Sequence, residues 1–527
     1  MRGNQRTAGE LSRKEGGKIF GSGSRAPIAI SLLVKNPLAA QQGQIRFHDI
    51  GDYLSKDEKL ANIAALGSIA GITAAGGWHA IVPDSHGDWL KQRDDSFIEH
   101  IALGNKKGAG PTLFENFSLG VVTNRDAWCY NSSKTNVAAN MTRMIAFYNK
   151  EAQRFDEKHP KADKKQRESF VDAFVDTDTT QIAWTVNLKQ ELVRNRRFTM
   201  DAACLVQGLY RPFNKQWMYF NRSFNERVLQ MPRLFPDASS PNIVIGVSAS
   251  ASRSAYSVFI SDHVTSLHAV DMVGSQYFPL YLYGDSNPGV AARPKQAALF
   301  GVEDQPAQTS QTKRRDAITA EGLEHFQSAY ASENINREDI FYYVYGLLHS
   351  PDYRERFIDN LGKELPRIPR VKSAADFWSF SQAGRELAEL HLNYDHAEPY
   401  PLKMDSGGKK LTDTDYRVEK MRYGKNGKDK DLTTLHYNDR ITLTGIPVEA
   451  YDYVVNGKPA LDWVVERQGV KTDKESGIVN DANDWAVETI GNPRYPLELF
   501  QRVITVSLET MKIVRSLPKL DIASTSN

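Results

Sequence analysis

Residues 28–34 (IAISLLV) form a continuous apolar run, bounded by Pro27 on one side and by Asn36-Pro37 on the other. This length, the β-branched members and the flanking prolines are typical of a strand buried on both faces of an α/β sheet. A second strand is predicted at residues 45–49, and a charged helix start follows at residues 55–58. Sheets usually have about five or six strands. Residues 1–78 are therefore predicted to be only the closing edge of an α/β sheet.

The stretch from Leu60 to Pro83 contains no Asp, Glu, Lys or Arg and is long enough to cross a bilayer. It consists mostly of small residues, however, which favours a buried helix followed by a loop over a membrane span. Residues 1–25 are polar and charged and lack the apolar core of a secretory signal. We therefore expect no membrane partner and a cytoplasmic location.

The charge and the cysteine content narrow the functional classes. A formal net charge of +2 over 527 residues means that any nucleic-acid surface must come from local basic clusters. The two cysteines, Cys129 and Cys204, are far apart, which excludes a disulfide scaffold and a thiolate zinc site and fits a reducing cytoplasm. Length alone favours about two to four domains.

Beyond residue 78 the pattern becomes mixed α/β. A helix is predicted from Asn136 to Phe155, with Met141, Met144, Ile145 and Tyr148 on its apolar face. Residues 284–318 are rich in Gly, Pro, Gln, Ala and Thr, a composition typical of a linker. The other predicted elements are a hairpin-like stretch at 208–235, strands at 242–247 and 256–260, helices at 339–357, 375–392 and 497–514, and a hairpin with a lysine-rich turn at 421–445.

The motifs of an independent enzyme are missing. The sequence contains no GxxxxGK[ST] loop for nucleotide phosphates and no G-x-S-x-G elbow for a serine nucleophile. Its Pro-Asp pairs lack the acidic-x-Lys partner of the common metal-dependent nucleases. The group His79, Asp84, His86 and Asp88 matches no metal motif, so a loop is favoured there and no metal is expected.

Several long segments resemble Type ISP restriction–modification enzymes. These are single-chain, ATP-dependent DNA enzymes that combine nuclease, helicase, N6-adenine methyltransferase and target-recognition domains. Residues 2–37 resemble the final part of the methyltransferase domain, and the rest resembles the specificity region that ends such proteins. The matching stretches in that region are 86–95 (HGDWLKQRDD), 209–227 (LYRPFNKQWMYFNRSFNER), 342–357 (YYVYGLLHSPDYRERF), 444–470 and 476–484 (SGIVNDAND).

The resemblance implies an α/β and α+β fold, in which the partial end of a methyltransferase-type sheet is followed by a mixed α/β target-recognition domain. We expect a methyltransferase remnant at 1–78, the first part of the target-recognition domain at 79–290, a linker at 291–318 and its C-terminal part at 319–527. Similar segments cover nearly the whole chain.

The chain departs from the family in its catalytic machinery. The glycine-containing loop for S-adenosylmethionine and the Asn-Pro-Pro-aromatic motif are both absent, and Asn36-Pro37-Leu38 lies too late in the chain to replace the latter. The helicase and nuclease elements are missing too. No cofactor is therefore expected here, although the full-length family uses S-adenosylmethionine, ATP and Mg²⁺. The chain is expected to be a truncated product, a split subunit or an expressed fragment, and not to be catalytic alone.

One element of the methyltransferase site is a candidate survivor. In related adenine methyltransferases, an aromatic residue just before a late strand stacks on the flipped-out base. By position this residue is Phe20, for which packing at the sheet edge is the alternative. Lys18 and Arg25 flank it and are predicted to meet DNA phosphates.

Basic clusters are the other candidates for DNA binding, because phosphate contacts position a duplex and side chains at base edges read it. For each of them a solvated charged face is the alternative. The candidates are Lys189, Arg194, Arg196 and Arg197 in the densest cluster, Arg211, Lys215, Arg222 and Arg227 in the aromatic-rich hairpin, and Arg253 in a small-polar loop.

Two hypotheses follow. The first is that the chain is the DNA sequence-recognition part of a Type ISP enzyme, a system of phage defence, and binds double-stranded DNA. The second is that it is one half of a split N6-adenine DNA methyltransferase, active only with a separately encoded upstream methyltransferase/helicase polypeptide. A product that does not fold is a third reading, since the open edge of a half sheet invites aggregation.

Overall fold

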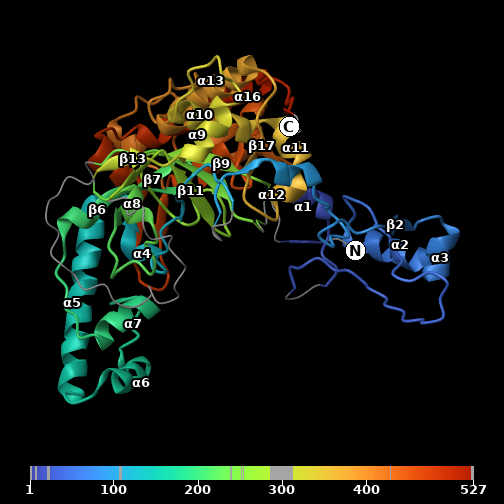
Figure 1. The fold of residues 1–527 in the computed structure, drawn as a ribbon. Helices are drawn as coiled ribbons and strands as arrows, with labels where there is room; N and C mark the ends of the chain where they lie inside the picture. The colour runs from blue at the N-terminus through green and yellow to red at the C-terminus, as the bar shows by residue number, and fades with distance from the viewer. Residues whose placement is uncertain are drawn as a thin grey trace.

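The computed structural model describes residues 3–5, 9–20, 24–105, 110–237, 240–250, 252, 255–284, 313–427 and 429–523. Figure 1 shows a central body from which two parts project on opposite sides. One is the arm, residues 134–198, and the other is the N-terminal part, residues 3–92. Within the described ranges, no helix is both long and apolar enough to span a bilayer.

Residues 28–34 do not form the predicted buried strand. They lie in a segment without helix or strand, and the exposed fractions of Ile30, Leu32, Leu33 and Val34 are 71%, 66%, 89% and 88%. The pattern favours a strand, but a strand buried on both faces needs sheet neighbours, and the described residues supply none. Instead, β1 (Ile45–Phe47) pairs antiparallel with β2 (His79–Ile81).

The helix predicted within residues 60–83 is present, but its predicted burial is wrong. Two short helices form, α2 (Lys56–Leu66) and α3 (Ile69–Ala74), and Lys59 is the one buried residue of α2 and α3. The predicted start is confirmed, because Ser55 Oγ accepts from Glu58 N (3.3 Å) and Glu58 Oε2 accepts from Ser55 N (2.8 Å). Small side chains bury too little apolar area to pull these helices into a core.

The N-terminal part is held together by polar contacts. Lys59 Nζ donates to the backbone oxygens of Glu15 and Gly17, both at 2.6 Å, and so ties α2 to α1 (Gly9–Glu15). The large hydrophobic cluster of the chain begins at Phe97 and extends to Val514. The core of the molecule therefore lies in the body and the arm.

Two four-stranded sheets form the centre of the body. In the first, the order is β10-β6-β7-β5, with β10 parallel to β6 and the other pairs antiparallel; in the second, β4-β11-β8-β9, all pairs are antiparallel. The predicted strands and hairpin at 208–260 are thus confirmed. The bounds are β4 Ser118–Leu119, β5 Tyr130–Asn131, β6 Leu205–Arg211, β7 Asn214–Tyr219, β8 Val244–Ser248, β9 Val258–Ser261, β10 Val264–Thr265 and β11 Ser275–Pro279.

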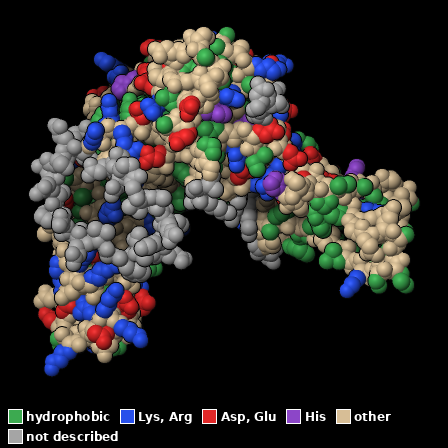
Figure 2. Space-filling model, viewed as in Figure 1, with side chains coloured by type: hydrophobic (Ala, Val, Ile, Leu, Met, Phe, Trp, Pro, Cys, Tyr) green, Lys and Arg blue, Asp and Glu red, His purple; other side chains and the backbone are tan. Residues whose placement is uncertain are grey.

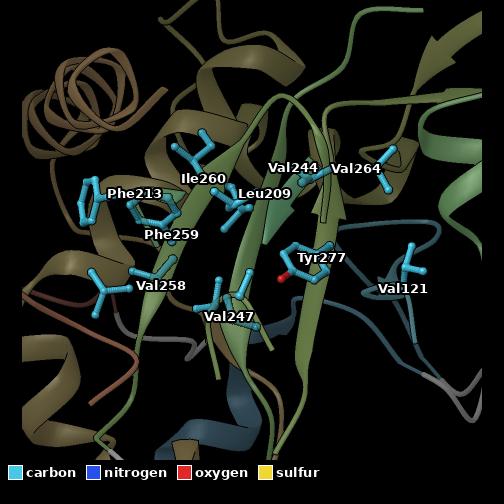
Figure 3. Packing of buried hydrophobic residues seen from close by; sticks show 14 of the residues in the cluster. Val121, Leu209, Phe213, Val244, Val247, Val258, Phe259, Ile260, Val264 and Tyr277 are labelled. Carbon is cyan, nitrogen blue, oxygen red and sulfur yellow. The ribbon is translucent and has the colours of Figure 1, made fainter. Parts of the chain in front are cut away.

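Aliphatic and aromatic side chains from the two sheets meet between them (Figure 3). Val258, Phe259 and Ile260 of β9 and Val247 of β8 are all buried. The side chain of Tyr277 reaches the residue that follows β10, where its hydroxyl donates to the backbone oxygen of Ser266 (2.9 Å). Buried β-branched residues on successive positions are the reason these short segments form central strands.

Helices α10 (Arg337–His349) and α13 (Ala374–Leu392) cover this centre, and both were predicted. They approach closely because each has a glycine at the crossing. A Cβ on Gly384 would lie 1.9 Å from the backbone oxygen of Tyr342, and a Cβ on Gly346 would lie 2.1 Å from that of Phe380. Ser381 Oγ adds a bond to the backbone oxygen of Asp339 (2.9 Å).

Further helices and strands complete the body. The predicted C-terminal helix is confirmed as α16 (Tyr495–Ser516), and the predicted hairpin as β16 (Arg422–Asn426) and β17 (Asp429–His436). The others are β3 Ile101–Ala102, α4 Asp126–Cys129, α8 Met231–Leu234, β12 Tyr281–Tyr283, β13 Arg314–Asp316, α9 Ala320–Gln327, α11 Pro351–Arg356, α12 Ile358–Leu361, β14 Arg367–Ile368, β15 Lys403–Asp405, β18 Thr442–Thr444, β19 Val454–Val455, β20 Lys458–Pro459, α14 Ala460–Arg467, β21 Val470–Thr472, β22 Val479–Asp481 and α15 Ala482–Asp484.

The arm consists of α5 (Lys134–Lys158), α6 (Lys164–Phe174) and α7 (Val186–Val193). The four residues predicted for the apolar face of α5 are all buried, so this prediction is confirmed. Ser133 begins the helix: its Oγ accepts from Asn136 N (3.0 Å) and donates to the Glu488 carboxylate (2.8 Å). The base of the arm is thus attached to the C-terminal region.

Buried residues of the predicted parts 79–290 and 319–527 belong to one hydrophobic cluster. A strand pair also joins them, since β3 pairs with β14, and β12 pairs with β13 at the end of the predicted linker. Residues 291–312 of the predicted linker lie outside the described residues, whereas residues 314–316 form β13. The domain boundaries themselves stay a prediction.

We predict that Gly384→Ala destabilises the body, because the new methyl group would collide with a backbone oxygen that cannot move aside. Overpacking of this kind costs about 1–3 kcal/mol, which would lower the urea midpoint followed by tryptophan fluorescence. Gly362→Ala is the matched control: its Cβ would lie 3.7 Å from the nearest atom, in helical backbone with φ of −72°. Equal midpoints for the two variants would contradict the close helix crossing.

Candidate nucleic-acid interface

A hollow runs beneath the body, with the arm on one side and the N-terminal part on the other (Figure 2). Helix α4 lies on the underside of the body, next to the arm (Figure 1). Two cavities of about 380 Å³ each open near it, and both are lined by Asn124. The turn that joins β4 to α4 therefore stands between them.

The backbone around Asn124 is fixed by hydrogen bonds. Val122 and Arg227 exchange two backbone bonds of 2.9 Å, and Arg125 N donates to Thr123 Oγ1 (3.2 Å). Asn124 itself is exposed and has a φ of 52°, in the left-handed region that asparagine tolerates better than most residues. The turn thus presents one polar side chain from a rigid base.

Arg125 lies behind this turn and is only 4% exposed. Its Nη2 donates to Thr185 Oγ1 (2.5 Å), whereas Nε and Nη1 have no hydrogen-bond partner. No carboxylate pairs with it in the described part of the chain. Burial lowers the pKa of Arg125 to about 10, which still leaves it charged at neutral pH. The turn therefore carries a positive charge without an ion-pair partner.

The densest predicted basic cluster lies in the arm, and its charges are paired there. Glu191, itself buried, forms ion pairs with both Arg194 (2.7 Å) and Arg196 (3.2 Å). Lys189 pairs with Asp172 (2.7 Å) and Arg197 with Asp156 (2.5 Å). These pairs join α5, α6 and α7, so the cluster holds the arm together and offers less free charge than its sequence suggests.

Two basic residues of the predicted hairpin point inward. Arg211 is 6% exposed, and its Nη1 donates to Ser266 Oγ (3.2 Å). Lys215 pairs with Asp395 (3.1 Å), and both side chains are largely buried. These two residues therefore stabilise the body.

Arg222 and Arg227 differ from the rest of the cluster. Both are exposed, and neither has an ion pair or a side-chain hydrogen bond among the described residues. Arg227 is placed beside the Asn124 turn by its backbone pair with Val122, and the backbone oxygen of Arg222 accepts from Asn187 Nδ2 (2.8 Å) at the start of α7. Arg227 thus lies beside the Asn124 turn, and Arg222 lies near the start of α7.

The candidates in the N-terminal part lie outside the helices and strands. Phe20 is 59% exposed, and both its stacking on a flipped-out base and its packing at a sheet edge stay predictions. Arg25 is exposed and its Nη2 donates to the backbone oxygen of Gln5 (2.8 Å), while Lys18 is half-buried. Arg253 lies outside the described residues.

Asp84, His86 and Asp88 lie in a turn, as predicted, whereas His79 lies in β2. The Asp84 carboxylate accepts from the backbone N–H of His86 (2.9 Å), Asp88 (2.8 Å) and Arg93 (3.2 Å). Among the described residues, no group of three or more His, Cys, Asp and Glu side chains is arranged to hold a metal ion.

Asn124 and Arg125 were not predicted from the sequence as DNA-binding residues, because the candidates were the residues of dense basic clusters. An isolated Thr-Asn-Arg-Asp stretch has no such density. Its only sequence signal is the asparagine flanked by turn-forming residues, and this signal is common to many loops.

Comparison of the chain with known proteins identifies a protein family that it matches. A family model described as the Type ISP C-terminal specificity domain matches residues 112–499. No curated protein gives a significant match.

Three solved structures match almost the whole chain. A nuclease-deletion mutant of the Type ISP restriction–modification enzyme LlaGI, in complex with a DNA substrate mimic, is 36% identical with a TM-score of 0.79, covering 99% of this chain and 36% of that one. The ATP-dependent Type ISP enzyme LlaBIII bound to DNA is 32% identical with a TM-score of 0.79, covering 99% and 30%. A DrdV–DNA complex is 28% identical with a TM-score of 0.74, covering 98% and 47%.

The chain spans less than half the length of each of these proteins. The predicted fold class, mixed α/β, is confirmed by the structure and by its likeness to them. The family model covers most of the chain. The chain therefore belongs to the Type ISP C-terminal specificity domain family.

Proposed function

We propose that this chain binds double-stranded DNA and supplies target recognition in a Type ISP restriction–modification system. The observation that carries the proposal is the likeness, over at least 98% of this chain, to three structures with DNA or a DNA mimic bound. The nuclease, helicase and S-adenosylmethionine-binding functions would reside in polypeptide other than this chain, together with their ATP and Mg²⁺.

The unpaired arginines support the same proposal. Phosphate contacts need cations that are not already neutralised, and Arg222 and Arg227 meet this condition among the described residues. The arm cluster, Arg211, Lys215, Lys18, Arg25 and Arg253 stay predictions as DNA contacts. The internal pairing of the arm cluster and of Lys215 favours a structural role for them.

We predict that the chain binds duplex DNA with an affinity that falls as salt rises. Each phosphate contact releases counterions, so log K against log salt should have a slope of about −0.9 per contact. Fluorescence anisotropy of a labelled duplex at 50–200 mM salt, roughly the range in which this effect is large, measures the slope. Absence of binding at low salt, or an affinity that salt does not change, would overturn the proposal.

We predict that Arg222→Ala and Arg227→Ala each weaken duplex binding and reduce the salt slope by about 1, because each removes a free cation. Lys189→Ala is the matched control, since this lysine is neutralised by Asp172 and an exposed pair of this kind contributes little stability. The same anisotropy titration compares the three. A larger loss for Lys189→Ala than for the two arginine variants would place the DNA on the arm cluster instead.

We propose a second candidate function, one half of a split N6-adenine DNA methyltransferase, because residues 28–34 are apolar and exposed. Successive side chains of an extended segment point to opposite faces, so Leu32, Leu33 and Val34 are apolar on both. Such a segment fits between two other strands of a sheet. A separately encoded upstream methyltransferase/helicase polypeptide would supply those strands.

We predict that co-expression with the polypeptide encoded directly upstream yields a complex on size-exclusion chromatography, and that the complex protects DNA by adenine methylation. Replacing Leu32, Leu33 and Val34 by Ser should abolish the complex, while duplex binding by the isolated chain stays unchanged. If the Ser variant still forms the complex, or if no complex forms with the natural chain, the split-enzyme hypothesis is wrong.

A further inference from the structure

Three asparagines of the described chain have left-handed backbone: Asn124, Asn195 and Asn456, with φ of 52°, 56° and 50°. The side chains of two of them are used inside the protein. Asn195 Oδ1 accepts from Arg197 (2.7 Å), and Asn456 Nδ2 donates to the backbone oxygen of His268 (3.2 Å). In the described part of the chain, the Asn124 amide has no partner. Its donor and acceptor are thus both free.

A left-handed backbone at a non-glycine residue is strained, and such strain concentrates at sites of function. The turn is nevertheless fixed, through the backbone pair of Val122 with Arg227 and the bond from Arg125 N to Thr123. A fixed base matters because a reading side chain must keep its geometry when DNA arrives.

The turn has charges of both signs around it: Asp126, Asp473 and Glu475 line one of the cavities beside Asn124, and Glu168 and Asp172 line the other. Arg227, exposed and unpaired, lies across from Val122, two residues from Asn124. Arg125 adds a buried positive charge behind it. The nearest carboxylate in sequence, Asp126, is already engaged, because it accepts from the Tyr210 hydroxyl (3.0 Å) and lies 4.0 Å from Arg211 Nη2.

A free side-chain amide is the group that pairs with the major-groove edge of adenine: its oxygen accepts from adenine N6 and its nitrogen donates to adenine N7. We propose that Asn124 reads an adenine of the target sequence in this way, while Arg227 contacts a neighbouring phosphate. This inference rests on the proposed function, duplex DNA recognition. It assigns sequence reading to the turn before α4 and not to the arginine-rich arm.

The test is selection of bound sequences from a randomised duplex pool by the full chain and by two variants. Asn124→Gly removes the amide and keeps the left-handed backbone without strain. Asn195→Gly makes the same change in the arm and is the matched control. The natural chain should enrich a site that contains an adenine, and Asn124→Gly should reduce the preference at that single position about tenfold or more.

The other positions of the site, and the salt slope, should not change in Asn124→Gly, because the phosphate contacts remain. The control Asn195→Gly should select the natural site. If Asn124→Gly enriches the natural site with undiminished preference, or if Asn195→Gly alters it equally, Asn124 does not read the DNA. If the natural chain enriches no sequence at all although it binds duplex, target recognition itself fails; if it does not bind, the proposed function fails.

Discussion

The crossing of α10 and α13 is the contact on which the body depends. Two glycines allow the backbones to meet, and a side chain at either position would force the helices apart. The second sheet and the C-terminal helix then pack on α13: Phe259 of β9 stacks on His391, and His391 Nε2 lies 2.9 Å from Thr510 Oγ1 of α16. The helix pair thus holds β9 and α16 in place, and its geometry determines the shape of the body above the hollow.

Most helices and hairpins could be predicted from the sequence, because they depend on residues that are close together along the chain. The apolar face of α5 and the capping box at Ser55 depend only on neighbours within a turn or two. Residues 28–34 show the limit of this reasoning, since their pattern describes a strand but a strand exists only through partners elsewhere. Among the described residues, this apolar run has no strand partner and is exposed.

A cluster of basic residues in the sequence does not always present free positive charge to a ligand, because carboxylates elsewhere in the chain can neutralise it. The arm cluster has the highest density of cations in its region, yet its partners Asp156, Asp172 and Glu191 become visible only when three helices are folded together. The candidate site has the opposite character. Asn124 is a single neutral residue, distinguished by a backbone angle that no composition or spacing encodes. Arg125 is distinguished by having no ion-pair partner among the described residues.

The hydrogen bond between Ser133 and Glu488 determines when the arm can be anchored to the body during synthesis. The first turn of α5 is bonded to a side chain 355 positions later, and Asn131 Nδ2 donates to the backbone oxygen of Val479. During synthesis, which proceeds from the N-terminus, the arm can form as helices long before its anchor leaves the ribosome. The hollow therefore acquires its final shape only when nearly all of the chain has been translated, so a prematurely terminated product would carry the arm without its orientation.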